Sequence, residues 1–306
     1  VNEAYMKNKY LIVIIIILSI IAIISSSSKK ETAFFNNDKV EVTIKDVANN
    51  EETNLDLEEY VIGVVAGEMP ASFEIEALKA QAVAARSYAL AKISTSTTSY
   101  DLVTDITNQV YITVEEMQKK WGTDFDFYYN RIKDAVESTK NIVIKYNGKI
   151  ISAYYFAMSN GSTEDVSLVF GEERDYLKSV DSAWDETVKN FIVTTEFTFS
   201  DFCTKLDIDC ANISIDSINR SPTNRVTSIV INNKEFKGTT FRSLLNLRST
   251  DFTIEIADNI KITTKGYGHG VGMSQYGANE MAKNGANYEE ILTHYYQDVD
   301  ISKINV

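Results

Sequence analysis

The longest run of apolar residues lies near the N-terminus, where residues 11–24 contain a single polar side chain, a serine. Two lysines precede this run and four serines follow it. With its flanks, the run approaches the roughly 20 residues that a helix needs to cross a bilayer, and the lysines favour a cytoplasmic N-terminus. Because no small-x-small cleavage site follows, the pattern predicts an uncleaved transmembrane anchor at residues 10–28 rather than a cleaved signal peptide. Residues 1–9 are then a short cytoplasmic N-terminus.

After a polar tether at residues 29–38, the spacing of apolar positions alternates between helix and strand periods. Helical spacing covers residues 57–67, 74–93, 113–121, 125–139, 241–247, 274–283 and 288–296. Strand alternation covers residues 39–44, 141–146, 149–157, 191–199, 225–231, 234–237, 252–257 and 260–264. Because the strands follow one another as hairpins rather than as βαβ units, we predict an α+β fold. Residues 39–306 are expected to form one large extracytoplasmic domain.

The composition excludes some classes of protein. The chain has 17 Tyr and 14 Phe, which indicates a folded globular part rather than a disordered one. The formal net charge is -13, so the chain lacks the basic face of a nucleic-acid-binding protein, and we expect no nucleic acid partner.

The only two cysteines, Cys203 and Cys210, allow two interpretations. Outside the cytoplasm an even number of cysteines permits a disulfide, whereas two small buried side chains would also account for the pair. A structural zinc site normally takes four protein ligands, and only two histidines are present to complete one. We therefore expect no zinc at the cysteines.

Glu68 is the first residue whose surroundings indicate chemistry. It lies in the turn between two predicted helices and is flanked by Val65, Met69 and Pro70. Apolar neighbours disfavour the charged form of a carboxyl, so we expect the pKa of Glu68 to be raised. A carboxyl that is neutral near pH 7 is what a general acid requires. Taken alone, the pattern is more typical of a solvated loop glutamate.

The glycine-rich stretch at residues 266–272, ahead of a predicted helix, is a second candidate segment. Glycines let a backbone approach a ligand, and a helix N-terminus presents free N–H groups. The stretch lacks the Gly-Lys-Ser/Thr of a phosphate-binding loop, and nucleotides are not expected outside the cytoplasm. His269, Gln275 and Tyr276 are therefore candidate substrate-binding residues. A histidine that hydrogen-bonds a glycine carbonyl is an equally good interpretation of His269.

Two blocks of sequence together resemble the stage II sporulation protein D family, whose domain is shared with the amidase enhancers. The first combines GEMP at residues 67–70 with QAVAAR at residues 81–86, and the second is GHGVGMSQYGA at residues 268–278. The resemblance extends over most of residues 40–300.

The resemblance implies a lytic transglycosylase that cuts peptidoglycan glycan strands during engulfment of the forespore. It also implies a cell-membrane location, no cofactor, and two partners: sporulation protein P, an amidase and endopeptidase, and sporulation protein M, a membrane protein. Family members often carry a His and two Cys ahead of the segment that is Gln109-Val110-Tyr111 here, and in some this cluster binds zinc. Because residues 101–108 contain neither thiol nor imidazole, we expect no metal there.

The implied reaction assigns roles to individual residues. Glu68 protonates the glycosidic oxygen, and its carboxylate then takes the proton of the muramoyl 6-hydroxyl, which closes a 1,6-anhydro ring. Arg86 is expected to bind an acetamido or lactyl oxygen or to orient Glu68, unless it is a surface arginine. Tyr176 and Lys178, two apart on an extended stretch, are expected to point together into the cleft, with ordinary edge-strand polarity as the alternative. Ser159 is a further substrate-binding candidate, in a Ser-Asn-Gly loop where the family is expected to have Ser-Gly-Gly.

Two other functions are compatible with the sequence. One is a non-catalytic, glycan-binding amidase enhancer, because the same domain has that role elsewhere. The other is a hydrolase, which would need a second carboxylate beside Glu68, with Asp181 or Asp185 as candidates. Only distances between these side chains separate the hydrolase from the transglycosylase.

Overall fold

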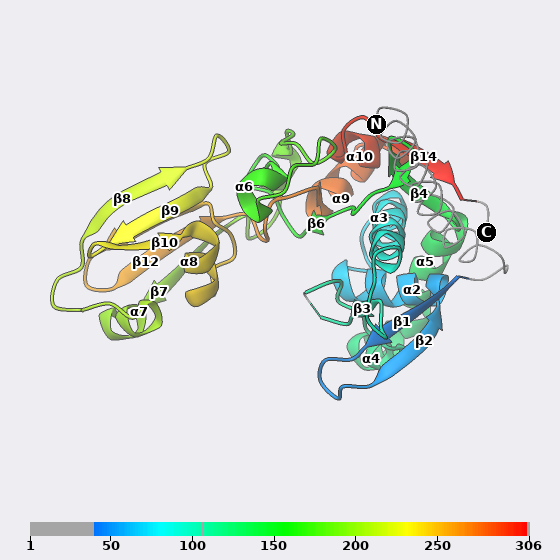
Figure 1. The fold of residues 1–306 in the computed structure, drawn as a ribbon, viewed down its shortest axis with the longest axis horizontal. Helices are drawn as coiled ribbons and strands as arrows, with labels where there is room; N and C mark the ends of the chain where they lie inside the picture. Colours follow the sequence, from blue (N-terminus) through cyan, green and yellow to red (C-terminus); the bar gives the residue numbers. More distant parts are fainter. Residues whose placement is uncertain (1–39, 106, 305–306) are drawn as a thin grey trace, which may run out of the picture.

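The computed structural model describes residues 40–105 and 107–304, which form two lobes (Figure 1). The hydrophobic core of the first lobe draws on residues 40–177 and 271–304, and the core of the second on residues 197–262. The second lobe is therefore an insertion into the chain of the first, so two connections run side by side between the lobes.

The predicted transmembrane helix is the part of the fold prediction that needs correction. The predicted anchor, residues 10–28, lies outside the described residues, as do the N-terminus at 1–9 and the tether at 29–38. Within residues 40–105 and 107–304, no helix is long and apolar enough to cross a membrane. The structure supports a mixed α+β fold with mainly antiparallel sheets.

Helix α3, Ile75–Ile93, lies at the centre of the first lobe (Figure 1). The helices packed against it are α2 (Leu57–Glu68), α5 (Phe125–Ser138), α9 (Gln275–Lys283) and α10 (Tyr288–Tyr295). Of the 19 residues of α3, 14 are buried, and many of them are alanines. Small side chains on all faces let several helices approach it at once, which explains why α3 has no exposed polar face.

Small sheets and short helices complete the first lobe. The strands are β1 (Glu41–Lys45), β2 (Glu52–Asp56), β3 (Leu102–Val103), β4 (Ile142–Tyr146), β5 (Lys149–Ile150), β6 (Tyr155–Phe156), β13 (Met273–Ser274) and β14 (Asp300–Lys303). They pair in the orders β2-β1-β3, β14-β4-β5 and β13-β6. The remaining helices are α4 (Val114–Trp121), η1 (Gly122–Asp124), α6 (Val166–Phe170) and η2 (Ala183–Thr187). The β13–β6 pair is parallel and joins segments more than 100 residues apart along the chain.

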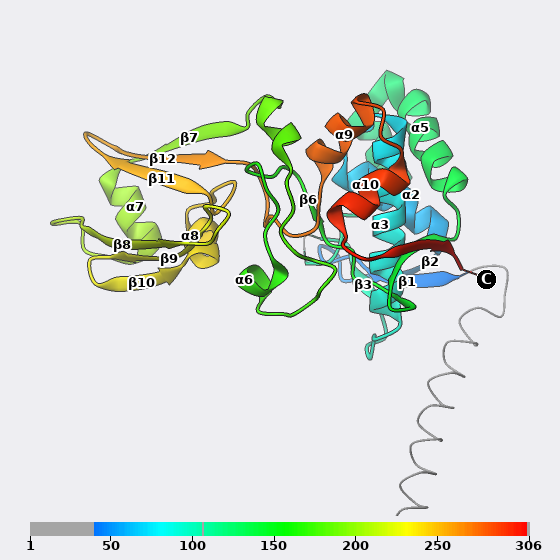
Figure 2. The same cartoon turned by 90° about the horizontal axis from the view of Figure 1, so that it is seen from above.

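The second lobe contains two three-stranded antiparallel sheets, seen as separate layers in Figure 2. One has the order β11-β12-β7, with β7 (Ile192–Phe197), β11 (Phe252–Ile256) and β12 (Ile260–Lys265). The other has the order β10-β9-β8, with β8 (Ile215–Arg220), β9 (Val226–Ile231) and β10 (Lys234–Lys237). Helices α7 (Phe199–Leu206) and α8 (Gly238–Leu244) contribute Phe202 and Phe241 to the core. A disulfide joins Cys203 to Cys210, so of the two interpretations of the cysteines the structure supports the bridge.

The glycine-rich stretch lies beside the segment that contains β6, where the two lobes join. Its four alternating glycines all have positive φ. A Cβ at Gly272 would collide with the carbonyl oxygen of Tyr154, and one at Gly270 would lie 2.6 Å from Nε of Arg225. The glycines therefore serve close packing within the protein itself, where we had expected an approach to a ligand.

The α+β prediction is confirmed, and most predicted helices begin and end within a few residues of the observed ones. The strands differ more. The second strand of the first hairpin was expected over residues 149–157, yet only Lys149 and Ile150 pair with β4. The reason is that the chain leaves this sheet and forms β6, which pairs with β13. Strands β2, β8 and β14 were not predicted, because exposed polar residues interrupt their apolar alternation.

Candidate active site around Glu68

Glu68 is the last residue of helix α2, and its side chain is half-buried. The helix begins after Asp56, whose carboxylate accepts a hydrogen bond from the backbone N–H of Glu58. It ends where Met69 becomes extended ahead of Pro70, so the apolar Val65 and Met69 flank the carboxyl. The carboxyl therefore lies at the C-terminal end of a helix, where the helix dipole disfavours negative charge.

Residues 109–112 cross directly over helix α2. A Cβ at Gly63 would collide with the ring of Tyr111, and one at Gly67 would lie 2.5 Å from the carbonyl oxygen of Val110. Two glycines four residues apart thus clear one face of the helix for an extended segment. This close approach brings the backbone N–H of Val110 to Oε1 of Glu68, where it donates a hydrogen bond of 2.7 Å.

The electrostatic setting of Glu68 favours its neutral form. Burial raises the pKa of Glu68 to about 7, and the hydrogen bond from Val110 opposes this rise without cancelling it. In the described part of the chain no lysine, arginine or histidine forms an ion pair with Glu68. The nearby Lys120 instead donates to the carbonyl of Ala66, at 2.8 Å. Glu68 therefore exchanges a proton near neutral pH, as a general acid and base requires.

Three tyrosines and Gln109 lie in the neighbourhood of this carboxyl. The Gln109 side chain, which is buried, links the hydroxyls of Tyr60 and Tyr155 at 3.0 and 2.8 Å. Asn108 lies 3.4 Å from the hydroxyl of Tyr88. Burial is the main cause that raises the pKa of the phenols of Tyr60, Tyr88 and Tyr155, and the charge of Glu68 contributes to each rise. The pKa of Tyr88 is raised to about 12. The phenols therefore remain protonated and act as neutral hydrogen-bonding groups.

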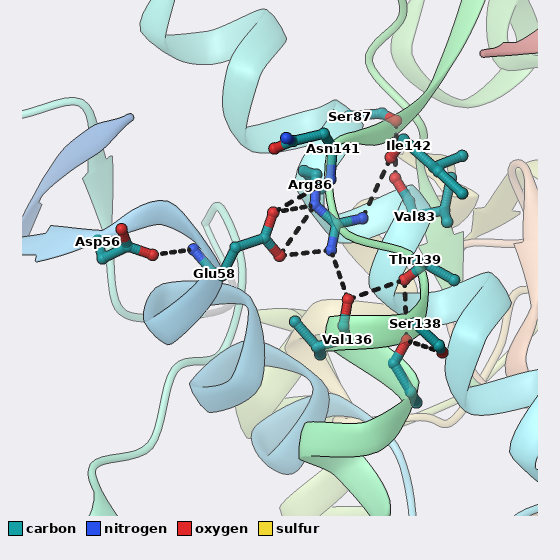
Figure 3. Close-up of polar contacts among 11 residues, drawn as sticks. Asp56, Glu58, Val83, Arg86, Ser87, Val136, Ser138, Thr139, Asn141 and Ile142 are labelled. Carbon is teal, nitrogen blue, oxygen red and sulfur yellow. Dashed lines mark hydrogen bonds and ion pairs between the residues drawn. The ribbon is translucent and has the colours of Figure 1, made fainter. Parts of the chain in front are cut away.

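Arg86 occupies a different place from the one we had expected (Figure 3). Its guanidinium has no exposed surface and forms an ion pair with Glu58, with Nη2 to Oε2 at 2.5 Å and Nε to Oε1 at 2.9 Å. It also donates to the backbone carbonyls of Val136 and Ile142. The side chain is completely buried and directed at Glu58 and these carbonyls, so neither substrate contact nor orientation of Glu68 fits this placement. Arg86 is not a surface arginine either.

Tyr176 and Lys178 do not point the same way. The ring of Tyr176 is buried against Tyr146, and its hydroxyl accepts a hydrogen bond from Arg174. Lys178 is only partly exposed and pairs with Asp165 at 3.2 Å. Because residues 175–177 form a turn rather than a strand, the alternation assumed for this pair does not apply.

Ser159 belongs to a buried hydrogen-bond network at the junction with helix α9. Its hydroxyl donates to the carbonyl of Ser182. In the same network Asp185 accepts from Ser182 at 2.8 Å and from Ser274 at 2.9 Å. Burial raises the pKa of Asp185, and the hydroxyl donors oppose the rise. Asp185 therefore has a structural setting of its own, while the other candidate for a second carboxylate, Asp181, is exposed.

The candidates from the glycine-rich block lie in packed surroundings. The Nδ1 atom of His269 accepts a hydrogen bond from the backbone N–H of Val271, and this differs from the expected bond to a glycine carbonyl. The His269 ring packs against Phe156 and Phe170. Burial, followed by the charge of Arg242, lowers the pKa of His269 to about 4, so it is neutral at pH 7. Gln275 donates to Gln81 at 3.3 Å inside the core.

The last candidate in this block, Tyr276, packs edge-on against Phe73 at a centroid distance of 5.0 Å. The contacts described here thus hold Glu68 beside Val110, and Gln109, which precedes Val110, binds Tyr60 and Tyr155. They do not join any of the other predicted site residues directly to Glu68.

The segment in which we expected no metal has structural contacts. Asp101 accepts a hydrogen bond from the backbone N–H of Thr43, and Asn108 accepts one from Val103. Across residues 40–105 and 107–304, no group of three or more His, Cys, Asp or Glu side chains is arranged to hold a metal ion. Absence of a metal remains a prediction.

Val110, Gln109 and Tyr155 were not among the predicted site residues, although their contacts place them at this site. Val110 acts through its backbone, so no residue type could reveal it. A usable signal was present in Gly63 and Gly67, because glycines four apart on one helix face indicate that another segment lies against that face.

Comparisons with known proteins show which sequences this chain resembles. The sequence profile of the family described as "Stage II sporulation protein" matches residues 46–146, which include Glu68 and Val110. Stage II sporulation protein D of Bacillus subtilis (strain 168) is 41% identical over 273 residues, which cover 86% of this chain and 79% of the relative. The Bacillus amyloliquefaciens protein of the same name is 42% identical over 272 residues, with the same two shares. The amidase enhancer of Bacillus subtilis (strain 168) is 32% identical over 295 residues, 76% of this chain but 39% of the relative.

Proposed function

The chain belongs to the stage II sporulation protein D family, and from this premise we propose that it is a lytic transglycosylase that cuts peptidoglycan glycan strands. The observation that carries the proposal is the state of Glu68. It is a half-buried carboxyl whose pKa is about 7, without an ion-pair partner among the described residues. Such a group can give up a proton and take one back within a single catalytic cycle.

The hydrogen bond from Val110 distinguishes the two oxygens of Glu68. Oε1 accepts the Val110 N–H at 2.7 Å, so in the neutral acid the proton resides on Oε2. Oε2 has no hydrogen-bond partner in the described part of the chain. Oε2 is therefore the atom that would face the glycosidic oxygen, and the Val110 N–H would stabilise the carboxylate once the proton has left.

In the proposed reaction, Glu68 donates its proton to the oxygen between N-acetylmuramic acid and N-acetylglucosamine. The bond from C1 of the muramoyl residue to that oxygen breaks, and the sugar becomes oxocarbenium-like. The Glu68 carboxylate then removes the proton of the muramoyl 6-hydroxyl, whose oxygen bonds to C1. No water is consumed, and Glu68 ends the cycle protonated, as it began.

One carboxyl is sufficient for this reaction because the nucleophile belongs to the substrate. A hydrolase would need a second carboxylate to attack C1 or to activate water. Asp185 accepts hydrogen bonds from Ser182 and Ser274 inside a buried network, which supports a structural role for this carboxyl rather than that of the second carboxylate.

We further propose that the domain works outside the cytoplasm, where a glycan strand of the cell wall would be its substrate. The Cys203–Cys210 disulfide supports this location, since disulfides persist in oxidising compartments. Association with sporulation proteins P and M remains a prediction of the family resemblance.

The experiment that tests the proposal is mass analysis of the products formed from purified, peptide-free glycan strands. A transglycosylase leaves 1,6-anhydro ends, so each fragment is one water lighter than a hydrolysis product. Ordinary reducing ends would contradict the single-carboxyl mechanism. Strand binding without any cleavage would instead favour a glycan-binding amidase enhancer, the role suggested by the more distant relative.

A further inference from the structure

The Gln109 side chain has one possible orientation. One end of its amide lies 3.4 Å from the backbone carbonyl of Ala85, and that same end lies 2.8 Å from the hydroxyl of Tyr155. A carbonyl oxygen can only accept a hydrogen bond, so the end of the amide that faces Ala85 must be the NH2 group. The opposite end is then Oε1, which lies 3.0 Å from the hydroxyl of Tyr60.

This orientation fixes the direction of both phenol hydrogens. Tyr60 must donate its hydrogen to Oε1 of Gln109, because an amide oxygen can only accept a hydrogen bond. Tyr155 must accept from the amide NH2, so its own hydrogen points away from Gln109. Among the described residues, the Tyr155 hydroxyl has no acceptor for that hydrogen.

The Tyr155 hydroxyl is linked to the proposed catalytic carboxyl through two adjacent residues of one segment. Gln109, which holds Tyr155, directly precedes Val110, whose N–H holds Glu68. The charge of Glu68 also contributes, after burial, to the raised pKa of Tyr155. Tyr155 is partly exposed, whereas Tyr60 has no exposed surface and closes the inner side of the amide.

The backbone of Tyr155 is fixed independently of Gln109. Tyr155 lies in β6 and pairs with Met273 of β13, and the N–H of Met273 donates to the carbonyl of Tyr154. The backbone of Tyr155 and its hydroxyl oxygen are thus both held in place. The hydroxyl is therefore pre-organised as a donor, since little entropy is lost when it binds a ligand oxygen.

We propose that Tyr155 is a substrate-binding residue whose hydroxyl donates a hydrogen bond to an oxygen of the sugar bound beside Glu68. The hydroxyl and acetamido groups of a peptidoglycan glycan offer oxygens of the required kind. This inference rests on the proposed function, because it takes the substrate and the place of the reacting bond from it. Gln109 is the positioning residue that directs the Tyr155 hydrogen toward the sugar.

The test measures the dissociation constant for peptide-free glycan strands by calorimetry in a Glu68→Gln background, in which no turnover interferes. Adding Tyr155→Phe removes one hydroxyl and keeps the ring, and we expect binding to weaken about 10-fold. The matched control is Tyr60→Phe, which removes a hydroxyl from the other end of the same amide. It should lower the melting temperature, because Oε1 of Gln109 loses its buried donor, and it should weaken binding clearly less than Tyr155→Phe does.

An unchanged dissociation constant for Tyr155→Phe would overturn the inference. Equal weakening by the two phenylalanine variants would do the same, because it would mean that both hydroxyls only support Gln109. The binding measurement is independent of cleavage. If the wild-type protein binds strands without cutting them, the proposed reaction fails, while the comparison of Tyr155→Phe with Tyr60→Phe still decides the role of Tyr155.

Discussion

The two ends of helix α2 hold two glutamates in opposite electrostatic settings. Glu58 lies in the first turn, where the helix dipole favours an anion, and it forms two short hydrogen bonds with the fully buried Arg86 (Figure 3). Glu68 lies at the last residue, where the dipole disfavours an anion, and it receives one backbone hydrogen bond from Val110. The same helix thus carries one carboxylate held as an ion and one carboxyl that burial keeps close to neutrality.

The comparison shows how a fold can separate stability from chemistry. The arginine of the QAVAAR motif stabilises the far end of the helix, and its absence from Glu68 is what leaves the pKa of Glu68 near 7. A guanidinium beside Glu68 would lower the pKa of that carboxyl and remove its acid function. Substitutions at the two ends of α2 should therefore differ in whether they mainly affect turnover or stability.

Replacement of the unpaired carboxyl should have the largest effect. Glu68→Gln keeps the shape of the side chain but cannot deliver or recover a proton. General acid–base steps contribute roughly 10²–10⁴-fold to rate, and one group serves both half-steps here, so turnover should fall by about 10⁴-fold or more. Turnover by Glu68→Asp should also be low, because the shorter side chain withdraws the carboxyl by about 1 Å, and such a displacement can lower the rate by about 10²-fold.

The measurement is turnover on purified peptide-free strands by protein whose fold is verified by circular dichroism. Strand binding should persist in Glu68→Gln, because the amide can still form hydrogen bonds. Near-normal turnover in this variant would assign the acid to another carboxyl and remove the basis of the comparison between the two ends of α2.

Replacement of the paired arginine should mainly affect stability. Arg86→Met leaves the Glu58 carboxylate and the Val136 and Ile142 carbonyls without their donor. Breaking a buried ion pair typically costs about 3–5 kcal/mol, so the free energy of unfolding from urea titration should fall by an amount in that range. Turnover per folded molecule should fall much less than in Glu68→Gln.

The matched control is the double variant Glu58→Gln with Arg86→Met, in which no unpaired carboxylate remains. It should recover part of the stability lost in Arg86→Met, since the isolated charge is the main cost. A loss of turnover in Arg86→Met as large as that in Glu68→Gln, at full folding, would return Arg86 to the catalytic site.

The sequence predicted those parts of this picture that depend on local pattern. The apolar neighbours of Glu68 indicated a raised pKa, which the structure supports, and the apolar spacing located α3 to within one residue. The partner of Arg86 was out of reach, because Glu58 lies 28 residues away and meets it only through the docking of α2 on α3. Tyr176 and Lys178 were misjudged because the segment turns between them, which places one side chain inside and the other outside.

The smallest of the three expected effects is a dependence of stability on pH that arises from Glu68 alone. Its pKa is about 7 in the folded protein, above the value of about 4.3 that an unfolded glutamate has. The folded state therefore binds more protons between these values, and the stability associated with neutral Glu68 is fully present below pH ~4.3. This stability is lost as the pH rises toward 7, because an ionised Glu68 is then tolerated better in the unfolded chain than in the folded one.

Glu68→Gln has no charge to bury, so its free energy of unfolding should exceed that of the wild type by about 1–3 kcal/mol at pH 8, with a much smaller difference at pH 4.5. Urea titration of both proteins at the two pH values measures this, and Glu59→Gln, which removes an exposed carboxyl from the same helix, is the control for loss of a charge. A difference between Glu68→Gln and wild type that is equal at the two pH values, or larger at pH 4.5, would mean that the folded protein holds Glu68 as an ion, as it holds Glu58.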